Sequence, residues 1–170
     1  MKTKTRTNPS TYSKVWRIVL CVAIPLAVGG IAAALTGSAM KSFQQMNQPP
    51  LSPPAWLFPV VWTILYVLMG LASYMIWSAE HSVFRNHSNV RNWLIVYGLS
   101  LVFNFCWSPV FFNLNWFWFA FVWLLALWGM IIYLVIKARS ISMAAMWMMV
   151  PYLLWVTFAT YLNAGIAILN

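Results

Sequence analysis

VVWTILYVLMGLASYMIW, the stretch from Val60 to Trp77, carries no charged side chain, and the apolar run that contains it covers about residues 55–79. A helix that crosses a bilayer needs about 20 consecutive, mostly apolar residues. The hydrocarbon core offers no partners to free backbone N–H and C=O groups, so a single spanning segment of this kind is helical. The stretch therefore predicts a transmembrane helix.

Comparable apolar segments lie at about residues 18–40, 92–112, 116–136 and 143–169. Hydrophobic residues make up 63% of the chain and charged residues 6%, with a mean hydropathy of +0.78. In soluble proteins roughly a quarter of all residues are charged. We predict an all-α integral membrane protein, a five-transmembrane-helix bundle that forms one domain over residues 18–170 after a basic tail at residues 1–17.

The distribution of cations predicts the orientation of this bundle. All Lys and Arg residues except Lys41 fall before the first segment, between the second and third, or between the fourth and fifth. Cations concentrate on the cytoplasmic side of membrane proteins. We expect a bacterial multi-pass membrane protein with a cytoplasmic N-terminus and a periplasmic C-terminus. The net charge of +9 forms no folded basic patch, which argues against nucleic acid as a partner.

The connection between the first two segments is rich in proline, with Pro49, Pro50, Pro53 and Pro54 close together. Proline fixes φ and removes a backbone donor, so this loop is stiff and not helical. Two interpretations remain open: the loop is a lid over a binding site, or it only stops one helix and starts the next.

Aromatic residues dominate the chain, which has twelve Trp. Trp near the end of a span normally lies at the headgroup level. We assign this role to Trp16, Trp56, Trp77, Trp93, Trp116, Trp118 and Trp147. Contact with lipid or with other helices is the expectation for Trp123 and Trp128, which lie inside the fourth segment.

Polar side chains inside the spans mark candidate sites. One helix face carries Asn104 together with Trp107 and Phe111, which follow it by three and seven residues. An Asn in a bilayer is costly unless it meets a partner or lines a cavity. A second stripe in residues 55–79 has small residues at its middle, which predicts close helix packing. Its members are Trp62, Tyr66, Gly70, Ser73 and Trp77.

The last segment carries a similar face, formed by Tyr152, Trp155, Ala159 and Asn163 at spacings of three, four and four. Ala159 leaves a gap between the larger side chains of this face. The gap is either a helix contact or the wall of a cleft, and the sequence leaves both open.

Acid–base and metal chemistry have few candidate residues. The chain has one acidic residue, Glu80, and its two His residues, His81 and His87, precede the third segment. A Ser-His-Asp arrangement is excluded because there is no Asp, and no Cys/His cluster has metal-ligand spacing. We therefore expect no metal and no permanently bound cofactor, and an interior that suits a flat, apolar, π-rich ligand.

Four strings together resemble the translocator-protein family, whose members are also called tryptophan-rich sensory proteins (TspO/MBR). They are Pro53-Pro54-Ala55-Trp56, the opening stretch from Val60 to Trp77, NFCWSPVFF from Asn104 to Phe112, and PYLLWVTFATYLN from Pro151 to Asn163. The resemblance implies a five-helix bundle, a homodimer, and a pocket near the loop between the first two helices. It also implies ligands such as protoporphyrin IX, sterols and synthetic isoquinoline-type compounds.

By position, the resemblance assigns pocket roles to Trp62, to Asn104 and Trp107, and to Trp155, Ala159, Leu162 and Asn163. Combined with the stripes above, the predicted ligand-binding residues are Trp62, Tyr66, Asn104, Trp107, Phe111, Tyr152, Trp155, Ala159, Leu162 and Asn163.

Three functions compete at this point. The first is a membrane receptor or sensor that binds porphyrin in an aromatic cleft and acts in tetrapyrrole handling or stress regulation. The second is an enzyme that degrades porphyrin in light, with Trp62 and Trp155 as candidate redox residues. The third is a passive transporter of tetrapyrroles or sterols, since a charge-free interior argues against ion coupling.

Overall fold

The computed structural model describes residues 11–39, 43, 45–79 and 87–170. Its helices are α1 (Thr11–Thr36), α3 (Leu57–Ala79), α4 (His87–Phe112), α5 (Phe117–Ile141) and α6 (Met143–Leu169). Each of these five helices is long and apolar enough to cross a membrane. The structure confirms the prediction of an all-α, five-helix membrane bundle.

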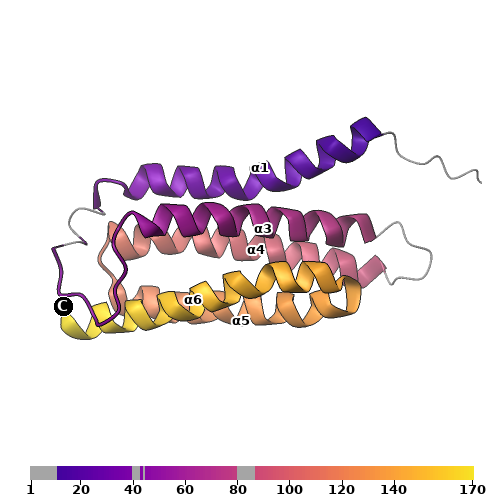
Figure 1. The fold of residues 1–170 in the computed structure, drawn as a ribbon. Helices are drawn as coiled ribbons and strands as arrows, with labels where there is room; N and C mark the ends of the chain where they lie inside the picture. The colour runs from indigo at the N-terminus through magenta and orange to yellow at the C-terminus, as the bar shows by residue number, and fades with distance from the viewer. Residues whose placement is uncertain (1–10, 40–42, 44, 80–86) are drawn as a thin grey trace, which may run out of the picture.

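The helices are arranged in three layers (Figure 1). α1 lies on one side against α3 and α4, and α5 and α6 pack together on the other side. Between these layers, α3 contacts α6 and α4 contacts α5. The start of α1 and the end of α6 lie at opposite ends of the bundle, as an odd number of antiparallel spans requires.

The first helix differs from its predicted bounds. It begins at Thr11, where we predicted Ile18, and it ends at Thr36, where we predicted Met40. Hydropathy locates the hydrocarbon boundary, whereas Lys and Arg are good helix formers that let the helix continue beyond it. Part of the predicted basic tail is therefore helical. Gly37 follows the last helical residue, and Gly favours helix ends.

Two other boundaries were misplaced for the same reason. α4 begins at His87, earlier than the predicted Asn92, and so includes Arg91. α5 continues past the predicted end at Ile136 to Ile141, and so includes residues 137–140, which were expected to separate the fourth and fifth segments. Cations in a last helical turn also interact favourably with the helix dipole. The remaining polar connection, residues 80–86, and Lys41 lie outside the described residues.

Short turns hold the later helices as antiparallel neighbours. Between α4 and α5, Asn115 adopts a φ of 53°, which Asn tolerates better than most residues. The side chain of Asn113 in this turn donates to the carbonyl of Leu35 at the end of α1, at 3.1 Å. Ser142 alone separates α5 from α6, and its hydroxyl accepts from the backbone N–H of Ala145 at 3.3 Å.

Small residues set the approach of α1 to α3, as the stripe in residues 55–79 predicted. A Cβ at Gly70 would lie 2.6 Å from the Cα of Val22 and 2.7 Å from the carbonyl oxygen of Cys21. The two backbones can therefore approach this closely only because residue 70 has no side chain.

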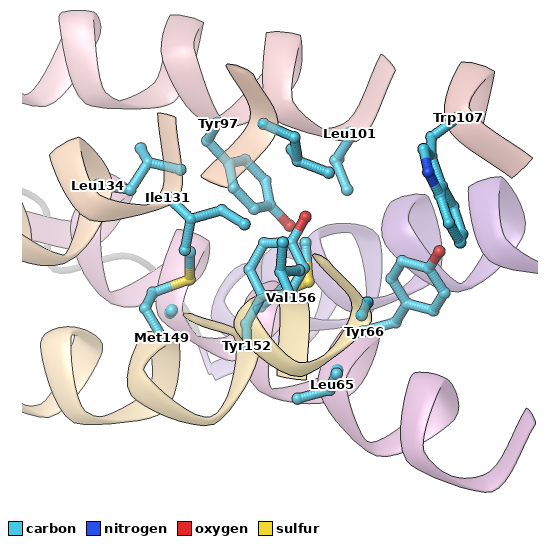
Figure 2. Packing of buried hydrophobic residues seen from close by; sticks show 14 of the residues in the cluster. Leu65, Tyr66, Tyr97, Leu101, Trp107, Ile131, Leu134, Met149, Tyr152 and Val156 are labelled. Atoms are coloured by element: carbon cyan, nitrogen blue, oxygen red, sulfur yellow. The ribbon is translucent and has the colours of Figure 1, made fainter. Parts of the chain in front are cut away.

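The buried core runs along the centre of the bundle (Figure 2). Met69, Ile131, Met149 and Tyr152 are fully buried there. Figure 2 shows Tyr97 and Tyr152 in the middle of this cluster, and the rings of Tyr66 and Trp107 toward one end of it. Large residues of α1 stay exposed, in keeping with a helix that packs on one side and faces lipid on the other.

The assignment of Trp93 to the membrane surface was wrong. Its side chain is completely buried, its indole N–H donates to the carbonyl of Leu134 at 2.8 Å, and its ring stacks on Tyr97 at 5.3 Å. Because α4 begins at His87, Trp93 lies within the helix rather than at its end. The other Trp residues assigned to the surface are half-buried or exposed: Trp16, Trp56, Trp77, Trp116, Trp118 and Trp147.

Candidate ligand-binding cavity

A cavity of about 400 Å³ lies between α1, α3, α4 and α6. Its volume falls in the range of about 300–1,000 Å³ that is usual for small-molecule sites. It is lined by Leu26, Gly29, Gly30, Ala32, Ala33, Thr36, Gly37, Ala55, Phe58, Pro59, Trp62, Thr63, Tyr66, Asn104, Trp107, Ser108, Phe112, Trp155 and Ala159.

Aromatic rings from α3, α4 and α6 form one side of the cavity. The rings of Trp62 and Tyr66 stack at 5.4 Å with 29° between their planes, one turn apart on α3. The edge of Phe58 meets Trp155 at 5.9 Å. Such offset and edge-to-face pairs are favourable arrangements for aromatic rings and restrain one another. The cavity therefore has preformed aromatic walls.

The side formed by α1 is built mostly from small residues. At Gly29 a Cβ would lie 2.0 Å from the ring of Tyr66, so the α1 backbone rests directly on that ring. At the next residue, Gly30, a Cβ would meet no other atom within 4 Å. Adjacent glycines therefore do different things: Gly29 permits a helix contact, and Gly30 leaves space in the cavity.

Asn104 connects three helices beside the cavity. Its side-chain oxygen accepts from the hydroxyl of Tyr66 on α3 at 3.3 Å, and its NH₂ group donates to the hydroxyl of Tyr152 on α6 at 3.0 Å. Asn104 is 2% exposed. An unpaired amide at this depth would be costly, so these bonds hold both tyrosines in place.

A second amide supports Trp107 from behind. In the orientation that satisfies both of its polar atoms, the side chain of Asn163 accepts from the indole N–H of Trp107 at 3.3 Å and donates to the carbonyl of Phe117 at 2.9 Å. The ring of Trp107 also stacks on Phe111 at 5.1 Å. These contacts fix the plane of Trp107 at the cavity wall.

The structure divides the predicted ligand-binding residues into two groups. The group that lines the cavity consists of Trp62, Tyr66, Asn104, Trp107, Trp155 and Ala159. The group that is buried behind this wall consists of Phe111, Tyr152, Leu162 and Asn163. Phe111, Tyr152 and Asn163 contact lining residues by ring stacking or hydrogen bonds and do not line the cavity themselves.

Sequence reasoning missed the contribution of α1 and of two phenylalanines. Leu26, Gly30 and Ala33 line the cavity, but small residues on a uniformly apolar helix give no directional signal. Phe58 lies one turn before Trp62 and Phe112 lies just after Phe111. The spacing of Phe58 from Trp62 was the available signal for that residue, because side chains four apart share a helix face.

None of the four loop prolines proposed as a lid lines the cavity: Pro49, Pro50, Pro53 and Pro54. The loop is fastened to α6 instead. A Cβ at Gly165 would lie 2.5 Å from Pro49, which shows that the proline rests on the α6 backbone. The hydroxyl of Tyr161 donates to the carbonyl of Pro50 at 2.9 Å. Ala55 and Phe58, which follow the prolines, do line the cavity.

Reciprocal hydrogen bonds complete this attachment of the loop. The backbone N–H of Asn47 donates to the side-chain oxygen of Asn170 at 3.0 Å, and the side-chain amide of Asn170 donates to the carbonyl of Asn47 at 3.1 Å. The loop thus joins two cavity-lining helices, α1 and α3, while it is held by the end of a third, α6.

Comparison with known proteins agrees with this arrangement. A sequence profile described as the TspO/MBR family matches residues 21–169, which includes every predicted site residue. The chain belongs to the TspO/MBR family. A similar relative is the tryptophan-rich protein TspO of Chlorobaculum tepidum, 33% identical over 92% of this chain and 98% of the relative.

Other members of the TspO/MBR family extend over most of the chain as well. The tryptophan-rich sensory protein of Cereibacter sphaeroides is 33% identical over 78% of this chain and 80% of its own length. The translocator protein of Ovis aries is 34% identical over 76% of this chain and 75% of its own length. The chain is thus a TspO-family, multi-pass membrane protein, of a family whose members are named as sensors and translocators.

Proposed function

We propose that this TspO-family protein is a membrane receptor or sensor that binds porphyrins such as protoporphyrin IX, and similar flat hydrophobic molecules, in the cavity between α1, α3, α4 and α6. The observation that carries the proposal is the pairing of an aromatic wall, with Trp62, Trp107 and Trp155, against a wall of small α1 residues. A planar ring system fits between two such walls because it can stack on aromatic faces while its other face meets Gly and Ala.

Three polar side chains of the cavity lining already have hydrogen-bond partners within the protein, which favours an apolar ligand. The hydroxyls of Thr36 and Thr63 donate to the carbonyls of Ala32 and Pro59, each one turn earlier on its own helix. Asn104 is already bonded to two tyrosines. Burial of apolar surface, at about 25 cal/mol per Å², is then the main source of binding free energy.

A titration of purified protein with protoporphyrin IX, followed by visible absorbance and Trp fluorescence quenching, tests the proposal. We expect saturable binding with a Kd in the micromolar range, since association costs offset much of the burial. Ala159→Phe should raise the Kd more than about tenfold, because the new ring occupies the cavity. The matched control is Ala126→Phe, on the exposed face of α5, and it should bind as the wild type does. Unchanged binding to the Ala159 variant would refute a site in this cavity.

Light-dependent degradation of porphyrin is the second candidate function. Trp62 lines the cavity and stacks on Tyr66, so the radical cation left when the indole gives an electron to a photoexcited porphyrin can be stabilised by the neighbouring ring. Dioxygen would take that electron from the porphyrin radical anion, and the indole would regain one from the porphyrin, so that the net reaction is oxidation of porphyrin by dioxygen. If the protein is an enzyme, porphyrin absorbance decays under light at a rate proportional to protein, with many turnovers, and Trp62→Phe and Trp155→Phe slow the decay. A flux assay in proteoliposomes tests passive translocation separately.

Orientation and assembly belong to the same proposal. We place the protein in a bacterial cell membrane with the N-terminus in the cytoplasm, on the basis of the distribution of Lys and Arg. A homodimer is the expected assembly. Mass measurement of the detergent-solubilised protein tests the dimer, which the binding proposal does not require.

A further inference from the structure

A second, apolar groove lies along the first half of α1, and it shares no lining residue with the cavity. Its volume is about 360 Å³. Its walls come from α1, α3 and α4, and they consist of Leu20, Cys21, Ile24, Ser73, Trp77, Leu94, Tyr97, Gly98 and Leu101. Along α1, residues 20–24 contribute to the groove and residues 26–37 contribute to the cavity.

The groove is suited to a hydrocarbon chain. Of the two hydroxyls among its lining residues, that of Ser73 donates to the carbonyl of Gly70 at 2.8 Å within α3, and that of Tyr97 is buried. At Gly98 a Cβ would meet no atom within 4 Å, so the surface of α4 is open at this point. A polar ligand would lose its hydration here without new partners, whereas an alkyl chain gains by burial.

The groove opens on the outer surface of the bundle, where the surrounding bilayer would lie. Leu20 and Ile24, at its α1 edge, are 40% and 48% exposed. Figure 1 shows the first part of α1 leaning away from α3. Pro25 lies inside this helix, and a proline within a helix removes a backbone hydrogen bond and bends it. A chain from the bilayer can therefore enter beneath α1 from the side.

Cations stand at one end of the groove, on the same helix faces as its apolar lining. The guanidinium of Arg17 lies over the ring of Trp77, 5.1 Å from its centroid, one turn before Leu20. Arg91 shares the α4 face with Leu94 and Gly98, at spacings of three and four, and it is exposed. α1 and α4 begin at the same end of the bundle. On both helices a cation therefore lies between the apolar groove residues and that end.

We propose that this groove is a binding site for an anionic glycerophospholipid, which inserts one acyl chain between α1 and α4 and places its phosphate near Arg17 and Arg91. The charge at the end of the groove selects an anionic headgroup over a zwitterionic one. The apolar lining selects an amphiphile over a free phosphate ion. This site is independent of the porphyrin cavity.

Native mass spectrometry of the detergent-solubilised protein tests the site. The protein is titrated with phosphatidylglycerol and, separately, with phosphatidylcholine of identical acyl chains. We expect phosphatidylglycerol to bind about tenfold more tightly or better, and the preference to vanish when both Arg17→Gln and Arg91→Gln are present. Inorganic phosphate in millimolar excess should not displace the lipid.

Filling the groove supplies the second arm of the test. Gly98→Leu should reduce phosphatidylglycerol binding about tenfold or more, because its side chain occupies the space for the acyl chain. Gly129→Leu is the matched control, since a Cβ there also meets no atom within 4 Å but lies on α5, away from the groove. Gly30→Leu, in the porphyrin cavity, should leave lipid binding unchanged. Ile24→Trp fills the groove from α1 and replaces Gly98→Leu if that variant does not fold.

Two results would overturn the proposal. One is equal binding of the two lipids to the wild-type protein. The other is unchanged phosphatidylglycerol binding in both groove-filling variants. If Gly98→Leu instead separates a complex of two copies and leaves the lipid bound per chain unaltered, the groove belongs to an interface between copies and the lipid site is wrong.

Discussion

The side-chain amide of Asn104 donates a 3.0 Å hydrogen bond to the hydroxyl of Tyr152, which joins α4 to α6 at a point where both residues are buried. Asn104 also accepts from Tyr66 of α3 at 3.3 Å. Hydrogen bonds between membrane helices contribute about 0.6 kcal/mol on average and up to about 1.7 kcal/mol. This amide therefore stabilises the bundle and also sets the position of the cavity wall, since Tyr66 and Asn104 both line the cavity.

Removing the Tyr152 hydroxyl should destabilise the protein. Tyr152→Phe leaves the NH₂ group of Asn104 without this partner, and we expect the free energy of unfolding to fall by about 1–2 kcal/mol. Tyr161→Phe is the matched control, because the hydroxyl of Tyr161 bonds to the carbonyl of Pro50 at an exposed site where water can replace it. Denaturant unfolding in detergent micelles measures both. If Tyr152→Phe and Tyr161→Phe lost the same free energy of unfolding, the buried bond would have no special role in stability.

The contact between α1 and α3 gives a second stability prediction. Gly70→Ala places a Cβ against the backbone of Val22 and Cys21, which cannot move aside as a flexible side chain can. We expect a loss of about 1–3 kcal/mol in the free energy of unfolding. Gly129→Ala, where the Cβ meets open space, should be neutral or stabilising by up to about 1 kcal/mol. Thermal unfolding of the two variants measures this difference. If Gly70→Ala were as stable as Gly129→Ala, the contact would be refuted.

Sequence reasoning predicted the helices and part of the site for one physical reason. A polar residue inside an apolar segment has to face protein or a cavity. Asn104 therefore indicated the interior face that includes Trp107, and Asn163 the one that includes Trp155 and Ala159, and the structure brings both faces to one cavity. The gap at Ala159 proves to be part of the cavity wall. The depth of each residue within the wall was not predictable, because Tyr152 and Asn163 have the same spacing as the lining residues but lie behind them.

The remaining errors come from features without a signal in the sequence pattern. The small α1 residues that line the cavity look like any residues of a lipid-facing helix, and only the packing of α1 on α3 gives them a direction. The burial of Trp93 depends on where α4 begins, and hydropathy locates the membrane boundary instead of the helix end. The attachment of the proline-rich loop to α6, through Asn47 and Asn170, is a contact between residues far apart in the chain, which local patterns do not encode.

Orientation in the membrane is open to a direct test. The concentration of Lys and Arg at one end of the bundle predicts that a reporter fused after Asn170 reads as periplasmic and that a reporter inserted near His87 reads as cytoplasmic. Paired alkaline phosphatase and fluorescent-protein fusions at the two sites measure this. α4 begins and α6 ends at opposite ends of the bundle, so finding both reporters on the same side would refute the topology.

Aromatic contact, not charge, should govern porphyrin binding. Trp155 lines the cavity and packs against Phe58, so Trp155→Ala removes a large aromatic surface and should raise the Kd by more than about tenfold. Trp147→Ala, an exposed Trp of the same helix, is the matched control and should have little effect. Visible-absorbance titrations of the purified variants with protoporphyrin IX give the Kd values.

Lys41 provides the opposing test, because it is the one cation assigned by sequence to the outer side, where the anionic propionates of a porphyrin would need a partner. A surface ion pair contributes at most about 1 kcal/mol, and salt screens it over about 8 Å at physiological ionic strength. Lys41→Ala should therefore change the Kd by less than about tenfold, and raising the salt concentration from low to physiological should weaken binding only mildly. If burial beside Trp155 dominates, Trp155→Ala raises the Kd more than Lys41→Ala does. Capture of the propionates by charge predicts the opposite order. A Lys41 effect larger than the Trp155 effect, or a steep salt dependence, would show that electrostatic attraction at the loop, and not the aromatic cavity, determines affinity.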